Sequence, residues 1–153
     1  MATDDSTELI EPKGPERPPY VLDEQIGFLM RIANQRHTAI FTTRMIEGLT
    51  PPQFATLAKL REVGPCSQNK LGRLVYLDAA TIKGIVDRLS ARGFVLATDD
   101  PYDRRRRAVA LTDQGREVTN TAVEIAADIT EATLAPLNVE ERRQIVSLLK
   151  KIG

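Results

Sequence analysis

The segment from Ser67 to Gly115 constrains the fold of this chain more than any other. It contains two short helical patterns that meet at a tight junction, followed by two apolar runs joined by a loop that ends in four consecutive arginines. Apolar runs of strand length on either side of a polar loop are typical of a two-stranded hairpin. The segment therefore predicts a helix-turn-helix followed by a basic β-wing, a combination that points to duplex DNA.

Capping residues mark the two helices of this segment. Ser67 can cap the first helix, and Asp78 can cap the second by accepting hydrogen bonds from its free amide groups. Gly93 follows the second helix at a position where a left-handed residue is favoured. The apolar side of the second helix, which we expect to be buried, carries Ile82, Ile85, Val86 and Leu89.

The opposite side of the second helix, Asp78 to Arg92, carries mostly small residues with polar groups at its edges. Small side chains let a helix backbone approach the base edges in the major groove. An ordinary solvated helix face is the alternative. The residues on this side are Ala80, Gly84, Asp87 and Ala91, flanked by Thr81, Lys83 and Arg88.

The hairpin is predicted to form from strands at 94–97 and 108–111. Its loop holds four arginines but only three acids, Asp99, Asp100 and Asp103, so some arginines must project toward an anionic partner. Arginine suits the narrow minor groove of DNA, where negative potential is concentrated. We expect Asp103 to pair with a neighbouring arginine and to order the loop. A solvated loop is the alternative.

Charge is distributed unevenly along a chain whose net charge is zero. Residues 1–24 carry seven acids and two bases, whereas residues 59–112 carry eleven bases and six acids. The basic excess coincides with the predicted DNA reader, which favours phosphate contact there and resists it elsewhere. The acidic, proline-rich residues 1–20 are expected to form a flexible arm.

The helical patterns outside the reader predict a dimer. An amphipathic helix is expected from Asp23 to near Gly48, Thr50 opens the next, Thr112 caps a long one, and Asn138 opens the last after Pro136. Their apolar faces need a partner; a second copy is expected, and coverage of the chain's own core is the alternative. We predict a first dimerisation helix at 21–48, a DNA-binding lobe at 49–112 and C-terminal dimerisation helices at 113–153.

Other classes of protein are disfavoured by composition. No apolar run approaches the roughly 20 residues that span a bilayer, and the N-terminus is acidic, which predicts a cytoplasmic protein. One cysteine, Cys66, and one histidine, His37, offer no catalytic constellation or metal cluster, and there is no glycine-rich phosphate loop. We therefore predict no enzymatic activity, no metal site and no cofactor.

Three stretches together resemble the MarR family of winged helix-turn-helix transcription regulators: LTPPQFATLAKL, SQNKLGRLVYLDAATIKGIVDRLSARGFV and DPYDRRRRAVALTDQG. The similarity extends over about residues 23 to 151. It implies a mainly α fold with a small β-wing and terminal dimerisation helices. It also implies a homodimeric DNA-binding protein, mostly a repressor, that binds a pseudo-palindromic operator and releases it when a small molecule, often an aromatic acid, binds.

Carried onto this chain, the resemblance assigns groove-facing roles to one set of residues and phosphate or minor-groove roles to another. The helix that enters the major groove would use Ala80, Thr81, Lys83, Gly84 and Arg88. The preceding helix would hold phosphates through Ser67, Gln68 and Asn69. The wing would contribute Arg104 and Arg105; Arg106 and Arg107 extend its charge beyond the usual family pattern, so either pair could supply the minor-groove contact.

An effector site is expected on the first helix. His37, Phe41 and Arg44 fall on one side, where an imidazole, an aromatic ring and a guanidinium could hold an aromatic carboxylate. A histidine satisfied at an interface and an arginine paired across the dimer are the alternative. The opening DEQIGFLMR resembles regulators of aromatic or heteroaromatic acid breakdown, including hydroxynicotinate-type compounds.

Two further functions stay open from the residues alone. Cys66 could make the protein a thiol-based redox sensor, although it lies just before the helix-turn-helix rather than near the start of the first helix, and a structural thiol is favoured. A winged helix could also serve as a protein-interaction module without ligand control. Such a module would have little use for an exposed arginine-rich wing.

Overall fold

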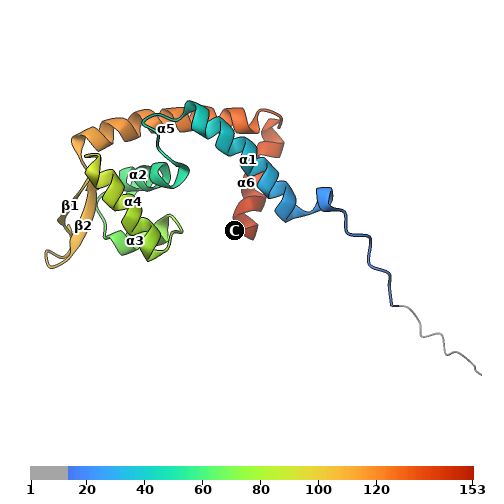
Figure 1. Cartoon of the computed structure of the whole chain (residues 1–153), viewed down its shortest axis with the longest axis horizontal. Coiled ribbons are helices and arrows are strands. Elements are labelled where there is room, and N and C mark those ends of the chain that lie inside the picture. The colour runs from blue at the N-terminus through green and yellow to red at the C-terminus, as the bar shows by residue number, and fades with distance from the viewer. Residues whose placement is uncertain (1–13) are drawn as a thin grey trace, which may run out of the picture.

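The computed structural model describes residues 14–153, so residues 1–13 of the predicted arm lie outside the described part. Residues 14–21 form no regular secondary structure. The remainder is mainly helical with one small sheet (Figure 1). In chain order the elements are η1 (Leu22–Glu24), α1 (Ile26–Arg44), α2 (Pro51–Val63), α3 (Gln68–Leu74), α4 (Ala79–Ala91), β1 (Val95–Asp99), β2 (Arg107–Leu111), α5 (Asp113–Leu134) and α6 (Val139–Ile152).

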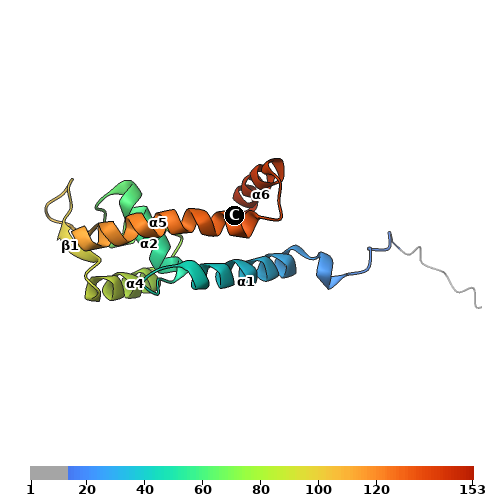
Figure 2. The same ribbon diagram turned by 90° about the horizontal axis from the view of Figure 1, so that it is seen from above.

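Helix α5 runs along one edge of the molecule and joins its two parts. Helices α2, α3 and α4 and the β-hairpin form a lobe beneath one end of α5 (Figure 1). Helix α1 lies beside α5 and extends away from the lobe, and α6 lies at the far end (Figure 2). This arrangement is a winged helix-turn-helix attached to a separate group of helices, the fold class expected from the sequence.

The helix starts follow from local capping, as predicted. The hydroxyl of Thr50 accepts a hydrogen bond from the amide of Gln53, whose side chain accepts one from the Thr50 amide in return. Asn138 forms the same reciprocal pair at the start of α6, and the Thr112 side chain caps α5. Each cap satisfies amide groups that have no partner inside the helix.

The first helix is shorter than expected at both ends. The chain makes a single 3-10 turn at Leu22–Glu24, and α1 starts only at Ile26 because Gln25 is extended and its side chain donates to the carbonyl of Val21. At the other end α1 stops at Arg44 rather than near Gly48. The chain turns there through two consecutive left-handed residues, Glu47 (φ 57°) and Gly48 (φ 59°).

The core of the lobe lies where α2, α3, α4 and the hairpin meet. The predicted apolar side of α4 is buried, with Ile82 and Leu89 fully inaccessible. The apolar side chains of α6 differ: none is buried, and Leu148 and Ile152 are 60 % and 64 % exposed. Among residues 14–153 no helix combines the length and the apolar character that crossing a membrane requires.

The β-hairpin is antiparallel and pairs Val95 with Leu111 and Asp99 with Arg107. Compared with the predicted 94–97 and 108–111, β1 starts one residue later and ends two residues later, and β2 starts one residue earlier and ends at 111 as predicted, so both strands reach further into the loop. The hairpin also contacts the start of α3, because the backbones of Cys66 and Val109 exchange two hydrogen bonds of 3.2 and 2.8 Å. This bridge fixes the wing relative to the helix-turn-helix.

Candidate nucleic-acid interface

Helix α4 is fixed in place by a cap at its N-terminus and by the burial of its apolar side in the core. Asp78 accepts a hydrogen bond of 2.7 Å from the amide of Thr81. That bond stabilises the ionised carboxylate and lowers the pKa of Asp78 below its usual value. With its apolar side buried, α4 presents the opposite side to solvent, as the sequence predicted.

The exposed side of α4 carries one ion pair and one guanidinium without a polar partner. Lys83 Nζ lies 2.8 Å from the Asp87 carboxylate. Arg88 extends back over Gly84, where a Cβ atom would be 3.6 Å from the guanidinium, and this guanidinium has no hydrogen bond or ion pair within residues 14–153. Ala80 and Thr81 are exposed near the start of the helix. A narrow backbone with cations along its edge matches what a major groove admits.

The three predicted phosphate contacts at the start of α3 have different surroundings. The Ser67 side chain caps α3 by accepting from the Lys70 amide at 3.2 Å. Gln68 is half-buried in a hollow of about 230 Å³ between α4 and the wing strands. Asn69 is exposed and lines, with Arg73 and Ala79, a second hollow of about 310 Å³ at the junction of α3 and α4.

The wing arginines are held to different degrees. Asp103 accepts from the amide and Nε of Arg105 at 3.0 and 3.1 Å, and Arg106 lies 3.8 Å from the same carboxylate. Arg105 above all keeps the pKa of Asp103 below its usual value. Arg107 pairs with Asp99 at 3.3 Å. The Asp103 pairing was predicted, and in the described residues Arg104 is the wing arginine without an ion pair.

Asp100, which the sequence analysis counted only among the acids of the loop, orders the wing tip. Its carboxylate accepts hydrogen bonds from the amides of Tyr102 and Asp103 at 2.8 and 3.2 Å. Aspartate before proline commonly forms such a turn, so the Asp100-Pro101 pair was the available signal. The tip is thus pre-organised before any partner binds.

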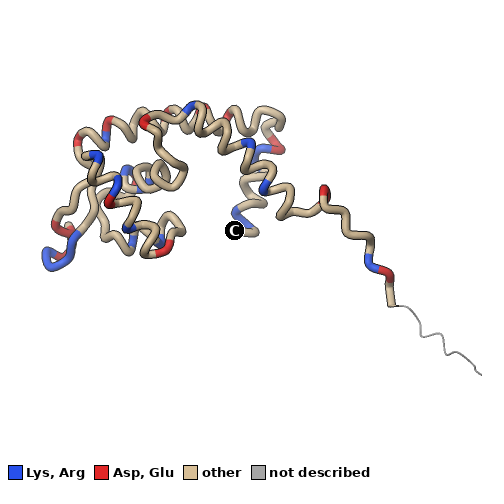
Figure 3. The backbone as a smooth tube through the Cα atoms, viewed as in Figure 1, with Lys and Arg blue, Asp and Glu red and all other residues tan. Residues whose placement is uncertain are grey.

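These groups gather on the part of the lobe that points away from α5. Figure 1 shows α3, α4 and the wing tip beneath α5, and Figure 3 shows cationic residues concentrated at the wing tip and acids along α5. Helix α4, which we call the recognition helix, and the basic wing therefore lie together, and the acidic helix α5 lies on the opposite side of the lobe from the wing tip. The arrangement can place α4 in the major groove of a duplex and the wing at the adjacent minor groove.

The predicted effector residues are only partly brought together. His37 Nδ1 lies 2.8 Å from the Thr133 hydroxyl on α5, and its ring centroid is 6.4 Å from that of buried Phe41. Phe41 in turn contacts Phe54 of α2, with ring centroids 6.1 Å apart. Arg44 is exposed and makes no hydrogen bond or ion pair with the other two among the described residues.

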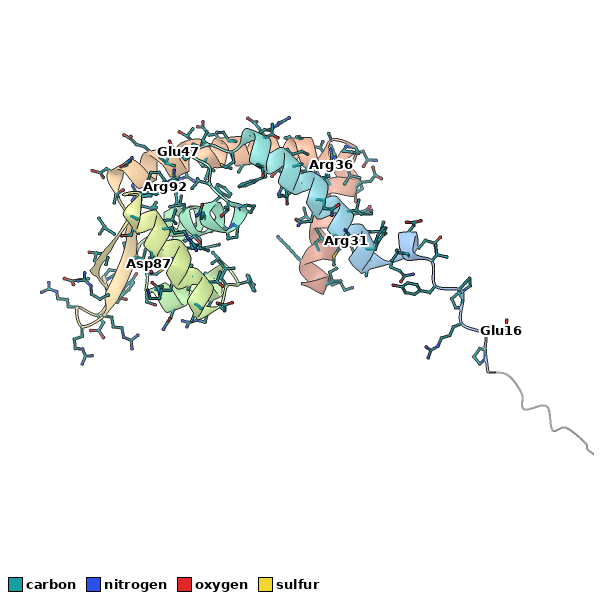
Figure 4. All side chains as sticks on the ribbon, viewed as in Figure 1. Glu16, Arg31, Arg36, Glu47, Asp87 and Arg92 are labelled. Atoms are coloured by element: carbon teal, nitrogen blue, oxygen red, sulfur yellow. The ribbon has the colours of Figure 1, made fainter. Side chains whose placement is uncertain are left out.

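A second residue of α1, missed by sequence reasoning, joins this cluster to α5. Arg36 donates to the carbonyl oxygens of Thr133 and Ala132 at 2.7 and 2.9 Å (Figure 4). These are carbonyls of the last turn of α5, which have no partner inside the helix. Arg36 and His37 together fasten α1 to the C-terminal end of α5.

Cys66 is buried rather than exposed to oxidants. It is 5 % accessible, and burial raises the pKa of its thiol above the usual value. The nucleophilic and oxidisable form is the thiolate, which burial disfavours. This environment fits the structural role favoured by the sequence.

The chain matches the model of a known family and a known protein of similar sequence. Residues 49–106 match the model of the MarR family. The repressor NicR of Pseudomonas putida is 44 % identical over 135 residues, which cover 88 % of this chain and 85 % of NicR.

Two solved structures are similar across most of this chain. Bordetella bronchiseptica BpsR, described as regulated in its DNA binding by 6-hydroxynicotinic acid, is 41 % identical with a TM-score of 0.82 and covers 88 % of this chain and 97 % of its own. Streptomyces coelicolor PcaV in complex with its natural ligand is 32 % identical with a TM-score of 0.80, over 89 % of this chain and 96 % of its own.

Proposed function

Because the chain belongs to the MarR family of transcription regulators, we propose that it is a repressor released from its operator by a small aromatic acid. The observation that supports DNA binding most directly is the joint position of the exposed, small-faced side of α4 and the arginine wing on one part of the lobe. In this proposal the protein acts by binding, without catalysing a reaction, and works on chromosomal DNA in the cytoplasm.

The DNA-side residues have three roles in this proposal. Lys83 and Arg88 contact base edges or phosphates from α4, and Ala80, Thr81 and Gly84 let the helix approach the bases closely. Gln68 and Asn69 contact phosphates, while Ser67 supports them by capping α3. Of the wing residues Arg104, Arg105 and Arg106, the first enters the minor groove and the other two hold the loop through Asp103.

The protein acts as a homodimer in this proposal. One lobe presents one recognition helix, which reads a half-site, and a palindromic operator requires a second helix one turn of DNA away. Exposed apolar side chains on α1 and α6, including Ile26, Leu148 and Ile152, supply a surface that a second copy would cover. The proposed units are the lobe at 49–112 and dimerisation helices at 21–48 and 113–153.

The effector site proposed is the junction of α1, α2 and α5 around His37 and Phe41, with Arg44 at the end of α1. A carboxylate there would compete with Thr133 for His37. Because His37 helps to fasten α1 to α5, that competition would change how the lobe is held. The ligand of BpsR, 6-hydroxynicotinic acid, carries the ring and the carboxylate that such a site requires.

The test is a pull-down of genomic DNA fragments with the full chain, followed by titration of a selected duplex at fixed salt. We expect affinity to fall steeply as salt rises, through counterion release. Addition of 6-hydroxynicotinic acid should release the duplex, and His37→Ala should abolish this release while preserving binding. Recovery of no preferred fragment would contradict the DNA-binding proposal; equal release from the His37→Ala variant would contradict the effector site.

A further inference from the structure

Two of the three tyrosines of this chain are almost fully exposed, and both lie in the DNA-binding lobe. Tyr76 is 94 % and Tyr102 is 96 % accessible, whereas Tyr20, before η1, is 76 % accessible. Phenylalanines of the core behave differently, since Phe41 and Phe94 are 4 % and 2 % accessible. A large aromatic ring left in water contributes no burial to the stability of the fold. Packing within the chain therefore does not account for Tyr76 and Tyr102.

Tyr76 also occupies a backbone position that favours glycine. Its φ is 57°, in the left-handed region that bulky residues adopt only at an energetic cost. The conformation is imposed by two hydrogen bonds that end α3: the Tyr76 amide donates to the Arg73 carbonyl at 3.3 Å and the Leu77 amide to the Gly72 carbonyl at 2.9 Å. Glycine would adopt this backbone without that cost, so the fold does not require a tyrosine here.

The surroundings of Tyr76 suit a polyanion. It lies in the turn between α3 and α4, two residues before Asp78, the cap of the recognition helix α4. Arg73 and Asn69, on the exposed side of α3, line with Ala79 the hollow beside this turn. The turn that carries Tyr76 is thus bordered by a guanidinium, an amide and the positive end of the α4 dipole.

Tyr102 lies in the wing tip, in the loop between β1 and β2. Its amide donates to the Asp100 carboxylate at 2.8 Å, and Arg104, which has no ion pair in the described residues, follows two positions later. The turn around Asp100 holds the backbone while the ring of Tyr102 extends into solvent. One tyrosine therefore lies at the start of the recognition helix and the other in the wing tip.

We propose that Tyr76 and Tyr102 bind the sugar-phosphate backbone of the operator on either side of the groove that α4 enters. Each phenol O–H donates a hydrogen bond to a phosphate oxygen, and each ring lies against deoxyribose. The contacts fix the register of the protein without reading sequence. Because a phenol is neutral, they release no counterions, unlike the arginine contacts. This inference rests on the proposed DNA-binding function.

The chain offers a direct test because it contains three tyrosines. The full chain labelled with 3-fluorotyrosine gives one fluorine resonance for each, assigned with Tyr20→Phe, Tyr76→Phe and Tyr102→Phe. On saturation with a selected operator duplex, we expect the Tyr76 and Tyr102 resonances to shift and the Tyr20 resonance to stay. Binding of the duplex with no shift at Tyr76 and Tyr102 would overturn the inference alone. Failure to bind any duplex would overturn the proposed function and this inference with it.

Affinity measurements separate a DNA contact from a structural role. Tyr76→Phe and Tyr102→Phe should each weaken operator binding about threefold to tenfold, with the slope of log affinity against log salt unchanged. Tyr20→Phe is the matched control and should bind normally. Tyr76→Gly should weaken binding while its melting temperature stays at or above that of the native protein. A lower melting temperature for Tyr76→Gly together with normal binding by Tyr76→Phe would show that the side chain serves the fold, and would overturn the inference.

Discussion

The four wing arginines differ in the hydrogen bonds and ion pairs that hold them, although the sequence alone does not distinguish them. Arg105 is held by Asp103 through both backbone and side chain, and Arg107 is paired with Asp99 across the hairpin. Arg104 has no ion pair within the described residues and projects from a turn that Asp100 has already ordered. It can therefore bind DNA without first breaking an interaction.

Arg104→Ala should weaken operator binding by about 1 to 3 kcal/mol and reduce the salt dependence by about one released ion. Fluorescence anisotropy titrations at several salt concentrations measure both quantities. Arg107→Ala is the matched control, because the guanidinium of Arg107 already forms an ion pair with Asp99. An equal loss for the two variants would show that the wing acts through total charge and not through Arg104.

Cys66 should be unreactive in the folded protein. Burial raises the pKa of the thiol above its usual value of 9.0, so the thiolate is scarce at pH 8 and is also shielded. We expect iodoacetamide to label the native protein slowly and the urea-unfolded protein fast, as followed by mass spectrometry. Peroxide should leave operator binding unchanged both in the native protein and in Cys66→Ser. If peroxide released DNA from the native protein but not from Cys66→Ser, Cys66 would be a redox sensor.

Among the elements, the junction between β2 and α5 is tightly packed. Thr112 caps α5 and donates to the Gly93 carbonyl at 2.6 Å, which draws the first turn of α5 against the start of β1. A Cβ atom on Gly115 would lie 1.8 Å from the carbonyl oxygen of Phe94. Two residues of the LTDQG sequence therefore have structural roles. Thr112 caps α5, and Gly115 allows the close approach of α5 to Phe94.

Gly115→Ala should destabilise the protein by about 1 to 3 kcal/mol, since the neighbouring backbone must move to admit a methyl group. Gly27→Ala is the control: it also replaces a helical glycine, but nothing lies within 4 Å of the added atom, so stability should be equal or slightly higher. Urea unfolding followed by circular dichroism measures both variants. Similar midpoints for the two would contradict the close approach of α5 to Phe94.

A second junction joins the loop after α1 to the end of α4. Arg92 donates to the Glu47 carboxylate at 3.2 Å, and its guanidinium carbon lies 4.7 Å from the centre of the Phe94 ring (Figure 4). Exposed pairs of this kind contribute at most about 1 kcal/mol to stability. The pair nevertheless orients Arg92 at the C-terminal end of the recognition helix.

Over the whole molecule, charge is separated between the DNA-binding lobe and the long helix behind it. Helix α5 carries five acids, Asp113, Glu117, Glu124, Asp128 and Glu131, and all of them are exposed. Their spacing places them along one side of the helix. Because α5 lies on the far side of the lobe from the wing tip (Figure 3), its charge repels phosphate there and favours approach through the basic side.

Glu124→Lys combined with Asp128→Lys should raise affinity for random-sequence duplex by roughly tenfold at low salt and reduce the preference for the operator. Competition titrations with operator and random duplexes measure the ratio. Glu124→Gln combined with Asp128→Asn, which removes charge without reversing it, should give a smaller change in the same direction. An unchanged ratio in the lysine variant would show that α5 has no part in orienting DNA.

Much of this protein was determined by the sequence itself, because the signals are local. Caps at Thr50, Asp78 and Thr112, the buried side of α4 and the basic hairpin each depend on residues a few positions apart, where backbone hydrogen bonding and helical periodicity act. The excess of arginines over acids in the wing also showed in advance that not all could pair. What the sequence could not specify was the early stop of α1, since a left-handed Glu47 carries no strong local signal.

Only the tertiary structure decided which partner each functional side chain has. His37 meets Thr133 across 96 positions, Arg36 reaches the carbonyls at the end of α5, and Arg105 rather than Arg104 takes Asp103. It also showed that Tyr76 is an exposed side chain on a backbone suited to glycine. Such pairings depend on how helices pack in space, and the balance among competing contacts of about 1 kcal/mol each is settled only when the chain is folded.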